Sequence, residues 1–153
     1  MTKSSNNSVS TKDLSVPVML PPDYRPSLKE EYMNPMHLEY FRQKLETWKA
    51  ELVRESTETI HHLQEETTNE PDMNDRASTE TDRALELRTR DRERKLINKI
   101  DEALMRIRDE SYGYCEETGE PIGLARLEAR PIATLSIEAQ ERHERDEKIY
   151  RDE

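Results

Sequence analysis

The segment from Met36 to Glu70 constrains the fold most, because it contains neither glycine nor proline. Its first half carries apolar residues at steps of four, three and four, as a helix that packs on a partner helix requires; these are Phe41, Leu45, Trp48 and Leu52. Asn34 is a good helix cap and Pro35 suits a first helical position. The segment therefore predicts one long helix beginning near Asn34.

A second long helix is expected to return along the first. Pro71 ends the first helix, since the residue before a proline avoids helical geometry. The second helix should run from about Arg76 to Glu110 and shows an apolar stripe at its far end, formed by Leu96, Ile97, Ile100, Leu104 and Ile107. The run Arg88–Lys95 has no apolar residue, so the seam there should be thin or polar. We predict an antiparallel coiled-coil hairpin over residues 34–110, roughly 50 Å long, with its tip at 69–77.

The remaining segments predict a small base and two terminal extensions. All three glycines lie between residues 111 and 135, where short turns and a β-hairpin around Glu117–Glu120 are expected. Residues 28–33 and 111–135 would form a globular, zinc-finger-like base of a short β-hairpin and helices, packed on Leu124, Leu127, Ile132, Leu135 and Ile137. Residues 136–153 predict a C-terminal helix capped by Ser136, and residues 1–27 a flexible arm that docks near Tyr24. The expected fold class is dominated by α-helix.

The composition agrees with a thin core, and the net charge restricts the classes of partner that the chain is expected to bind. Hydrophobic residues make up 32% and charged residues 38% of the chain. The net charge of −10 disfavours a reader of duplex DNA and a membrane-surface role, and favours a protein partner with a positive surface. No stretch is long and apolar enough to cross a bilayer, no signal peptide is recognisable, and the single cysteine excludes an internal disulfide, so we expect a cytoplasmic protein. The absence of a sustained apolar heptad favours a monomer.

The acidic tip is the first candidate site. Asp72 and Asp75 would stand at the end of a long arm, where they could meet a metal ion, a basic side chain or a moving loop. Asp at a helix start is also ordinary, since it caps the helix and solvates the turn. On position alone, capping is the better interpretation.

Cys115 is the second candidate. Cys115, Thr118, Ser136 and Ala139 have the spacing of a four-cysteine zinc site, but only one of the four is a thiol. A structural zinc needs four ligands, usually thiolates or imidazoles, so zinc binding is disfavoured and a free thiol in a small packed base is favoured.

A basic run in the second helix is the third candidate. Arg92, Leu96 and Lys99 share one helix face at steps of four and three, and the two cations could hold a phosphorylated small molecule. The competing interpretation is a solvated face with pairs spaced four residues apart. The histidines form no catalytic arrangement, and no glycine-rich phosphate loop is present.

Two stretches resemble the DksA family. They are DMNDRASTETDRALELRTRDRERKLINKIDEAL (Asp72–Leu104) and YGYCEETGEPIGLARLEARPIATL (Tyr112–Leu135). The resemblance implies a bacterial factor, not an enzyme, that inserts its coiled-coil tip into the secondary channel of RNA polymerase. With the alarmone ppGpp it would repress promoters for stable RNA and activate some biosynthetic promoters, without specific DNA contact.

The resemblance also implies roles for particular residues. By position, the tip residues are Asp72, Asp75 and Ala77, and the functional interpretation of Asp75 now becomes the better one. The ppGpp contact maps onto the third candidate: Arg92, Leu96 and Lys99.

The chain departs from the family at two places. Three of four zinc cysteines are replaced, which implies a zinc-independent member with no resident cofactor. Gln140 stands where typical members carry a lysine that contributes to ppGpp binding, so a weaker response is expected.

Two other functions stay open. A transcript-cleavage factor of the Gre type would use the same channel, with Asp72 and Asp75 helping to hold a catalytic metal. A generic coiled-coil adaptor would not depend on the tip, so an Asp75→Asn change would be silent.

Overall fold

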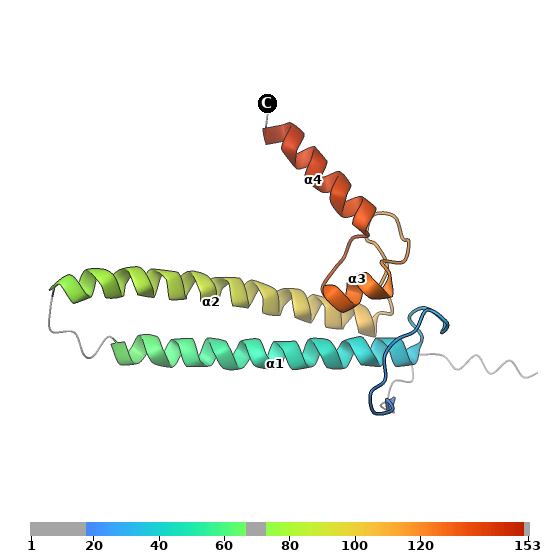
Figure 1. Ribbon diagram of the computed structural model, residues 1–153, viewed down its shortest axis with the longest axis horizontal. Coiled ribbons are helices and arrows are strands. Elements are labelled where there is room, and N and C mark those ends of the chain that lie inside the picture. Colours follow the sequence, from blue (N-terminus) through green and yellow to red (C-terminus); the bar gives the residue numbers. More distant parts are fainter. Residues whose placement is uncertain (1–17, 67–72, 152–153) are drawn as a thin grey trace, which may run out of the picture.

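The computed structural model describes residues 18–66 and 73–151. Its helices are α1 (Pro35–Glu66), α2 (Met73–Arg108), α3 (Leu124–Ala129) and α4 (Ile137–Arg151). The helices α1 and α2 lie side by side as a long antiparallel hairpin (Figure 1). The short α3 lies at the base of the hairpin, and α4 projects away from it.

Helix α1 begins where its capping residues predict. The Asn34 side-chain oxygen accepts the backbone N–H groups of Met36 at 2.8 Å and His37 at 3.1 Å. These are two of the donors that have no partner inside the first turn of a helix. The predicted Asn34 cap is therefore confirmed.

The apolar seam of the hairpin is concentrated near the base. Phe41, Leu45 and Leu52 of α1 are buried with Ile100, Ala103 and Ile107 of α2 in one cluster. Toward the tip, Val53, Leu85 and Leu87 are exposed. The contacts between the described parts of the two helices include a Lys49–Asp101 ion pair at 2.7 Å and a His62–Glu86 contact at 3.1 Å. The base half is thus packed by apolar side chains, and the tip half has the thin, polar seam that the sequence predicts.

Helix α2 ends in a turn whose backbone geometry cannot be predicted from the types of its residues. Glu110 has a left-handed φ of 62°. The N–H of Ser111 bonds to the Arg106 carbonyl and the N–H of Glu110 to the Ile107 carbonyl. This is the Schellman arrangement, which usually places glycine at the left-handed position. It turns the chain into the base and brings Tyr112 under Phe41, with ring centroids 5.6 Å apart.

The base is held by two tyrosine hydroxyls. Tyr112 is fully buried and donates to the Pro131 carbonyl at 2.7 Å. Tyr32 donates to the Gly113 carbonyl at 2.6 Å and accepts the Gly123 N–H at 3.0 Å, so one hydroxyl joins the start of the base to its middle.

Two details of the base differ from the sequence expectation. The expected β-hairpin is reduced to one isolated bridge between Tyr114 and Pro121. Helix α3 fits the expectation of short helices in the base, although its six residues show no helical period that would have placed it. Ile137 is half exposed rather than packed, since it is the first residue of the projecting α4.

The chain before α1 folds back on that helix. The Tyr24 hydroxyl donates to Glu30 at 2.7 Å, and the Tyr24 ring meets the Tyr40 ring edge-on at 6.2 Å. The part of the predicted arm before residue 18 lies outside the described residues. None of the described helices has a stretch suited to crossing a membrane.

Candidate functional site

The hairpin carries its tip far from the base. Helix α2 has 36 residues, so it extends roughly 54 Å at about 1.5 Å per residue. Asp75 and Ala77 belong to the first turns of α2, at the end opposite to α3 and α4 (Figure 1). Their side chains, and Asp72 altogether, lie outside the described residues. The described residues therefore form a narrow arm, with Asp75 in the first turn of α2 at the end far from the base.

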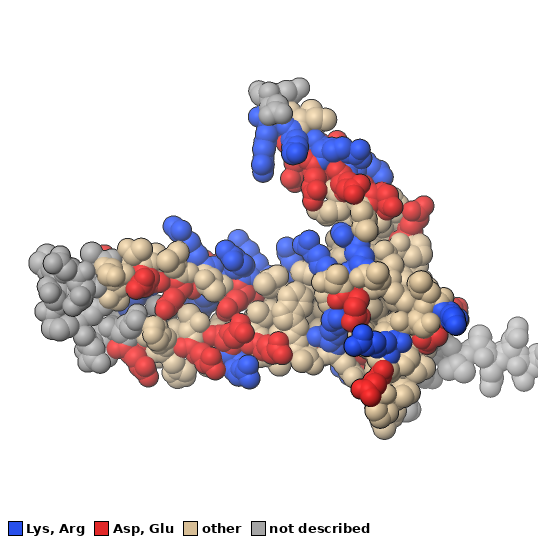
Figure 2. Space-filling model, viewed as in Figure 1, with Lys and Arg blue, Asp and Glu red and all other residues tan. Residues whose placement is uncertain are grey.

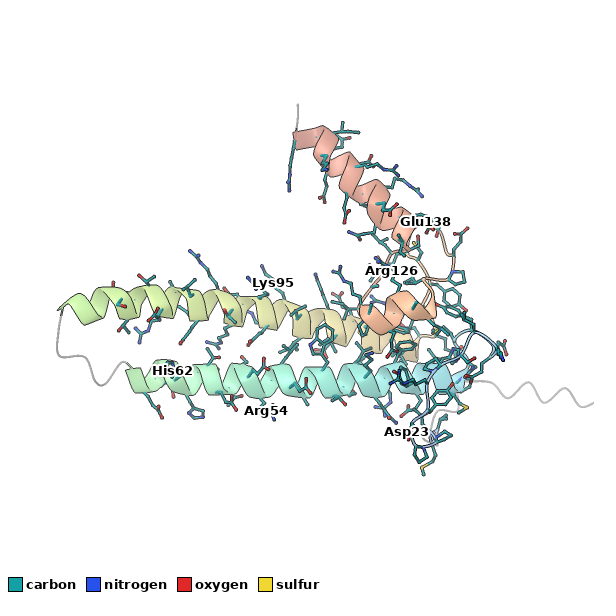
Figure 3. The ribbon with its side chains drawn as sticks, in the orientation of Figure 1. Asp23, Arg54, His62, Lys95, Arg126 and Glu138 are labelled. Atoms are coloured by element: carbon teal, nitrogen blue, oxygen red, sulfur yellow. The ribbon has the colours of Figure 1, made fainter. Side chains whose placement is uncertain are left out.

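One face of α2 is basic. Arg92 and Lys99 are exposed and Leu96 between them is half-buried. Figure 2 shows Lys and Arg side chains along the edge of α2 that faces away from α1, and Figure 3 shows Lys95 projecting from this edge. Acidic side chains gather instead on α1 in that view. The face predicted to hold a phosphorylated molecule is thus open to solvent and to a partner.

A cavity lies where α2 meets the base and the start of α4. Its volume is about 220 Å³, and Lys99 and Gln140 both line it. These two residues come from different helices, and the fold brings them together. Arg92 and Leu96 do not line the cavity; they lie one to two turns nearer the tip along α2. A cavity with a cation on one wall and an amide on the other can take an anionic ligand with several hydrogen-bond acceptors.

Three arginines that sequence reasoning did not single out also line this cavity. They are Arg106, Arg126 and Arg130, and with Lys99 they make four cations against the two carboxylates of Glu102 and Glu116. Arg126 donates from Nε to the Leu135 carbonyl at 2.9 Å, and Arg106 lies 3.8 Å from Glu116. Arg130 is exposed at the end of α3. No spacing in the sequence links these residues to Lys99, because they meet only through the fold of the base.

The four positions with metal-site spacing are brought together around a buried thiol. Burial of Cys115 raises its pKa, but hydrogen bonds outweigh burial: the Thr118 hydroxyl and the backbone N–H groups of Ser136, Thr118 and Glu117 lower the pKa from 9.0 to about 6. Thr118 and Ser136 thus serve as hydrogen-bonding partners of a thiolate. The Ser136 hydroxyl accepts the Ala139 N–H at 3.3 Å and caps α4, as predicted.

These residues do not fit a zinc ion. Ala139 has no donor atom and is fully buried, and the Ser136 hydroxyl is engaged in capping α4. The Thr118 hydroxyl bonds to Cys115 and accepts the Glu120 N–H at 3.3 Å. One thiolate falls short of the four ligands of a structural site. Among the described residues no group of three or more His, Cys, Asp or Glu side chains is placed to hold a metal.

The architecture is that of a helical-hairpin protein: a long antiparallel hairpin, a small base, and a cavity rich in cations where the two meet. Residues 37–107 match the family described as the N-terminal domain of DnaK suppressor protein DksA, and residues 110–145 match the prokaryotic dksA/traR C4-type zinc finger. The chain belongs to the DksA family.

Individual relatives agree with this assignment. The chain is 71% identical to the RNA polymerase-binding transcription factor DksA of Caulobacter vibrioides, over 86% of this chain and 92% of that protein. It is 50% identical to the protein of the same name from Escherichia coli strain K12, over 75% of this chain and 76% of that one. The solved structure of transcription factor DksA2 from Pseudomonas aeruginosa is 44% identical, covers 76% of this chain and 90% of its own, and superposes with a TM-score of 0.73.

Proposed function

We propose that this protein binds bacterial RNA polymerase and regulates transcription initiation, with its hairpin tip inserted into the secondary channel. The observation that carries the proposal is the family match over both the hairpin and the base, at residues 37–107 and 110–145. Its relatives at 71% and 50% identity are named RNA polymerase-binding transcription factors. The polar, narrow tip half of the hairpin suits entry into a water-filled channel.

The mechanism follows from differential binding. Asp72, Asp75 and Ala77 at the tip bind one polymerase conformation better than another, and this shifts the equilibrium between promoter-complex intermediates. Promoters with short-lived open complexes, such as those for ribosomal RNA, respond most. The protein makes no specific DNA contact and acts as a monomer in the cytoplasm.

The cavity between α2, the base and the start of α4 is the effector site in this proposal. Lys99, Arg92 and Leu96 of α2 meet ppGpp where the protein lies against polymerase, and Gln140 and Arg130 complete the wall around Lys99. Guanidinium and ammonium groups recognise the phosphates. Gln140 supplies a neutral hydrogen bond where a lysine would supply charge, so the response to ppGpp is present but reduced.

Transcription with purified components tests the proposal. The template carries a ribosomal RNA promoter, and the polymerase comes from the same bacterium. Inhibition by this protein that deepens with ppGpp and fades in the Asp75→Asn variant is the expected result. Lack of inhibition under every condition would contradict the proposal. Rapid shortening of the transcript in a backtracked complex would instead favour a Gre-like cleavage factor.

A further inference from the structure

Helix α4 leaves the body of the protein with few anchors. Only Ala139 is buried in this helix, Gln140 is half-buried, and every residue from Glu141 to Arg151 is exposed. The first turn is held through the Ser136 cap. The Gln140 side-chain amide donates to Glu144 of the same helix, so this hydrogen bond does not connect α4 to the base. Figure 1 shows α4 projecting away from the base. A helix held at its first turn alone can pivot there, so its direction depends on contacts further along.

One such contact joins Glu117 and His143. His143 Nε2 hydrogen-bonds the Glu117 carboxylate, across 26 residues of sequence. Since a carboxylate only accepts, Nε2 carries the hydrogen. His143 stands one turn beyond the buried Ala139, and Glu117 lies in the turn between Cys115 and Gly119. The bond thus reaches from the base to a point on α4 beyond its pivot.

The same two chain segments hold the four degenerate metal positions. Cys115 and Thr118 flank Glu117, while Ser136 and Ala139 precede His143 on or just before α4. A four-cysteine metal site would cross-link these segments rigidly. Here the Cys115 thiolate bonds to the Ser136 N–H and holds only the start of α4. The direction of α4 therefore depends on the hydrogen bond between Glu117 and His143.

We infer that Glu117 and His143 are positioning residues that set the direction of α4 and, through it, the cavity in which Gln140 faces Lys99. This inference rests on the proposed function for its effect on ppGpp, but not for its effect on α4. With the pair intact, Gln140 and the adjacent turn of α4 stay in place on the cavity wall. Without the pair, α4 pivots about Ala139, and the position of the Gln140 side chain opposite Lys99 varies.

The direct test measures the orientation of α4 relative to α2 by residual dipolar couplings of the backbone N–H groups in the full chain. Glu117→Gln and His143→Leu remove the charged acceptor and the donor, respectively. His143→Gln keeps a side-chain N–H donor and serves as the rescue. Glu120→Gln removes an exposed carboxylate from the same turn and is the matched control. Circular dichroism checks that helix content is unchanged.

We expect reduced and averaged couplings confined to α4 in Glu117→Gln and His143→Leu, with wild-type values in His143→Gln and Glu120→Gln. Couplings in α4 that match the wild type in both disrupting variants would overturn the inference. In transcription assays, the disrupting variants should raise the half-maximal ppGpp concentration about two- to fivefold, the loss expected for one exposed hydrogen-bonded pair. Inhibition in the absence of ppGpp should not change.

The two proposals fail differently. If wild-type protein shows no ppGpp response, the effector part of the proposed function fails, and the dipolar couplings still decide the role of the pair. If α4 moves in the variants but the ppGpp response stays at the wild-type level, the link from α4 to the cavity is wrong.

Discussion

Lys99 of α2 and Gln140 of α4 face the same cavity of about 220 Å³. Arg130 lines it as well, so a cation from the base stands beside the cation from the hairpin. Since the family resemblance implies a lysine at position 140, Gln140 changes the charge of a site that still holds several cations. It leaves the site basic but reduces its charge by one unit.

Restoring that charge should strengthen the response to ppGpp. A Gln140→Lys variant converts a neutral hydrogen bond to phosphate into a charge-assisted one, which we expect to be worth about 1 kcal/mol in this solvent-open cavity. The half-maximal ppGpp concentration in the transcription assay should fall about fivefold.

The control for Gln140→Lys is Glu141→Gln, which changes the net charge by the same amount at the next, exposed position of α4. It should leave the ppGpp response unchanged. An equal gain from both variants would mean that net charge, and not the cavity, sets the response.

The Cys115 thiolate should stabilise the fold in a pH-dependent way. Its pKa is lowered in the folded protein to about 6 from an ordinary 9.0, so the unfolded chain binds this proton more readily. The contribution is fully present above about pH 9 and is lost as the pH falls through 6. The free energy of unfolding, measured by urea titration from pH 5 to 9, should rise with pH more steeply in wild type than in Cys115→Ala.

The same variant tests the assignment of Cys115 as a hydrogen-bonded thiolate rather than a metal ligand. Cys115→Ala should cost about 2 kcal/mol at pH 8, the value for lost hydrogen bonds to a charged group. Adding zinc or a chelator to wild type should not change its stability. A chelator that unfolds the protein would contradict our conclusion that these residues do not fit zinc.

The two halves of the hairpin should respond differently to loss of apolar side chains. Ile100→Ala empties a fully buried position near the base and should lower the free energy of unfolding by about 2–5 kcal/mol. Leu85→Ala near the tip removes a side chain that is 55% exposed and should cost less than about 1 kcal/mol. Urea titrations of both variants measure the difference. Similar losses would mean that the tip half is packed as tightly as the base half.

Gly113 should be the glycine least able to accept a side chain. A Cβ there would lie 2.8 Å from the Met33 sulfur, and its φ of 90° already disfavours other residues. Gly119→Ala, at φ 73° with no atom within 4 Å of the new Cβ, suffers only the backbone strain. We expect Gly113→Ala to lower the melting temperature more than Gly119→Ala. An equal effect would show that Met33 moves aside without cost.

Local patterns predicted the hairpin well. Asn34 caps α1, Phe41, Leu45 and Leu52 are buried, and Ile100 and Ile107 meet them, because helix period and capping depend on neighbours in sequence. The end of α2 was placed only approximately. Its Schellman turn puts Glu110 in the left-handed region, and nothing in the residue type signals that geometry.

The base and the cavity could be predicted only in part. Lys99 was singled out by its spacing on α2 and by the family resemblance, and Gln140 by the resemblance alone. The walls contributed by Arg106, Arg126 and Arg130 depend on how a loop-rich segment folds. The Glu117–His143 bond is likewise a long-range contact that no spacing rule reveals. Contacts of this kind follow from tertiary packing, which overrides local propensity.

Site-specific photo-cross-linking tests the central claim most directly. A photoreactive phenylalanine analogue at Ala77, in the first turns of α2, is irradiated in the complex with RNA polymerase, and the same analogue at Tyr150 on the exposed end of α4 is the control. We expect position 77 to cross-link to active-site elements inside the secondary channel, and position 150 to cross-link only to the outer surface. Cross-links from position 77 to the outer surface alone, in a complex that still forms, would contradict this claim.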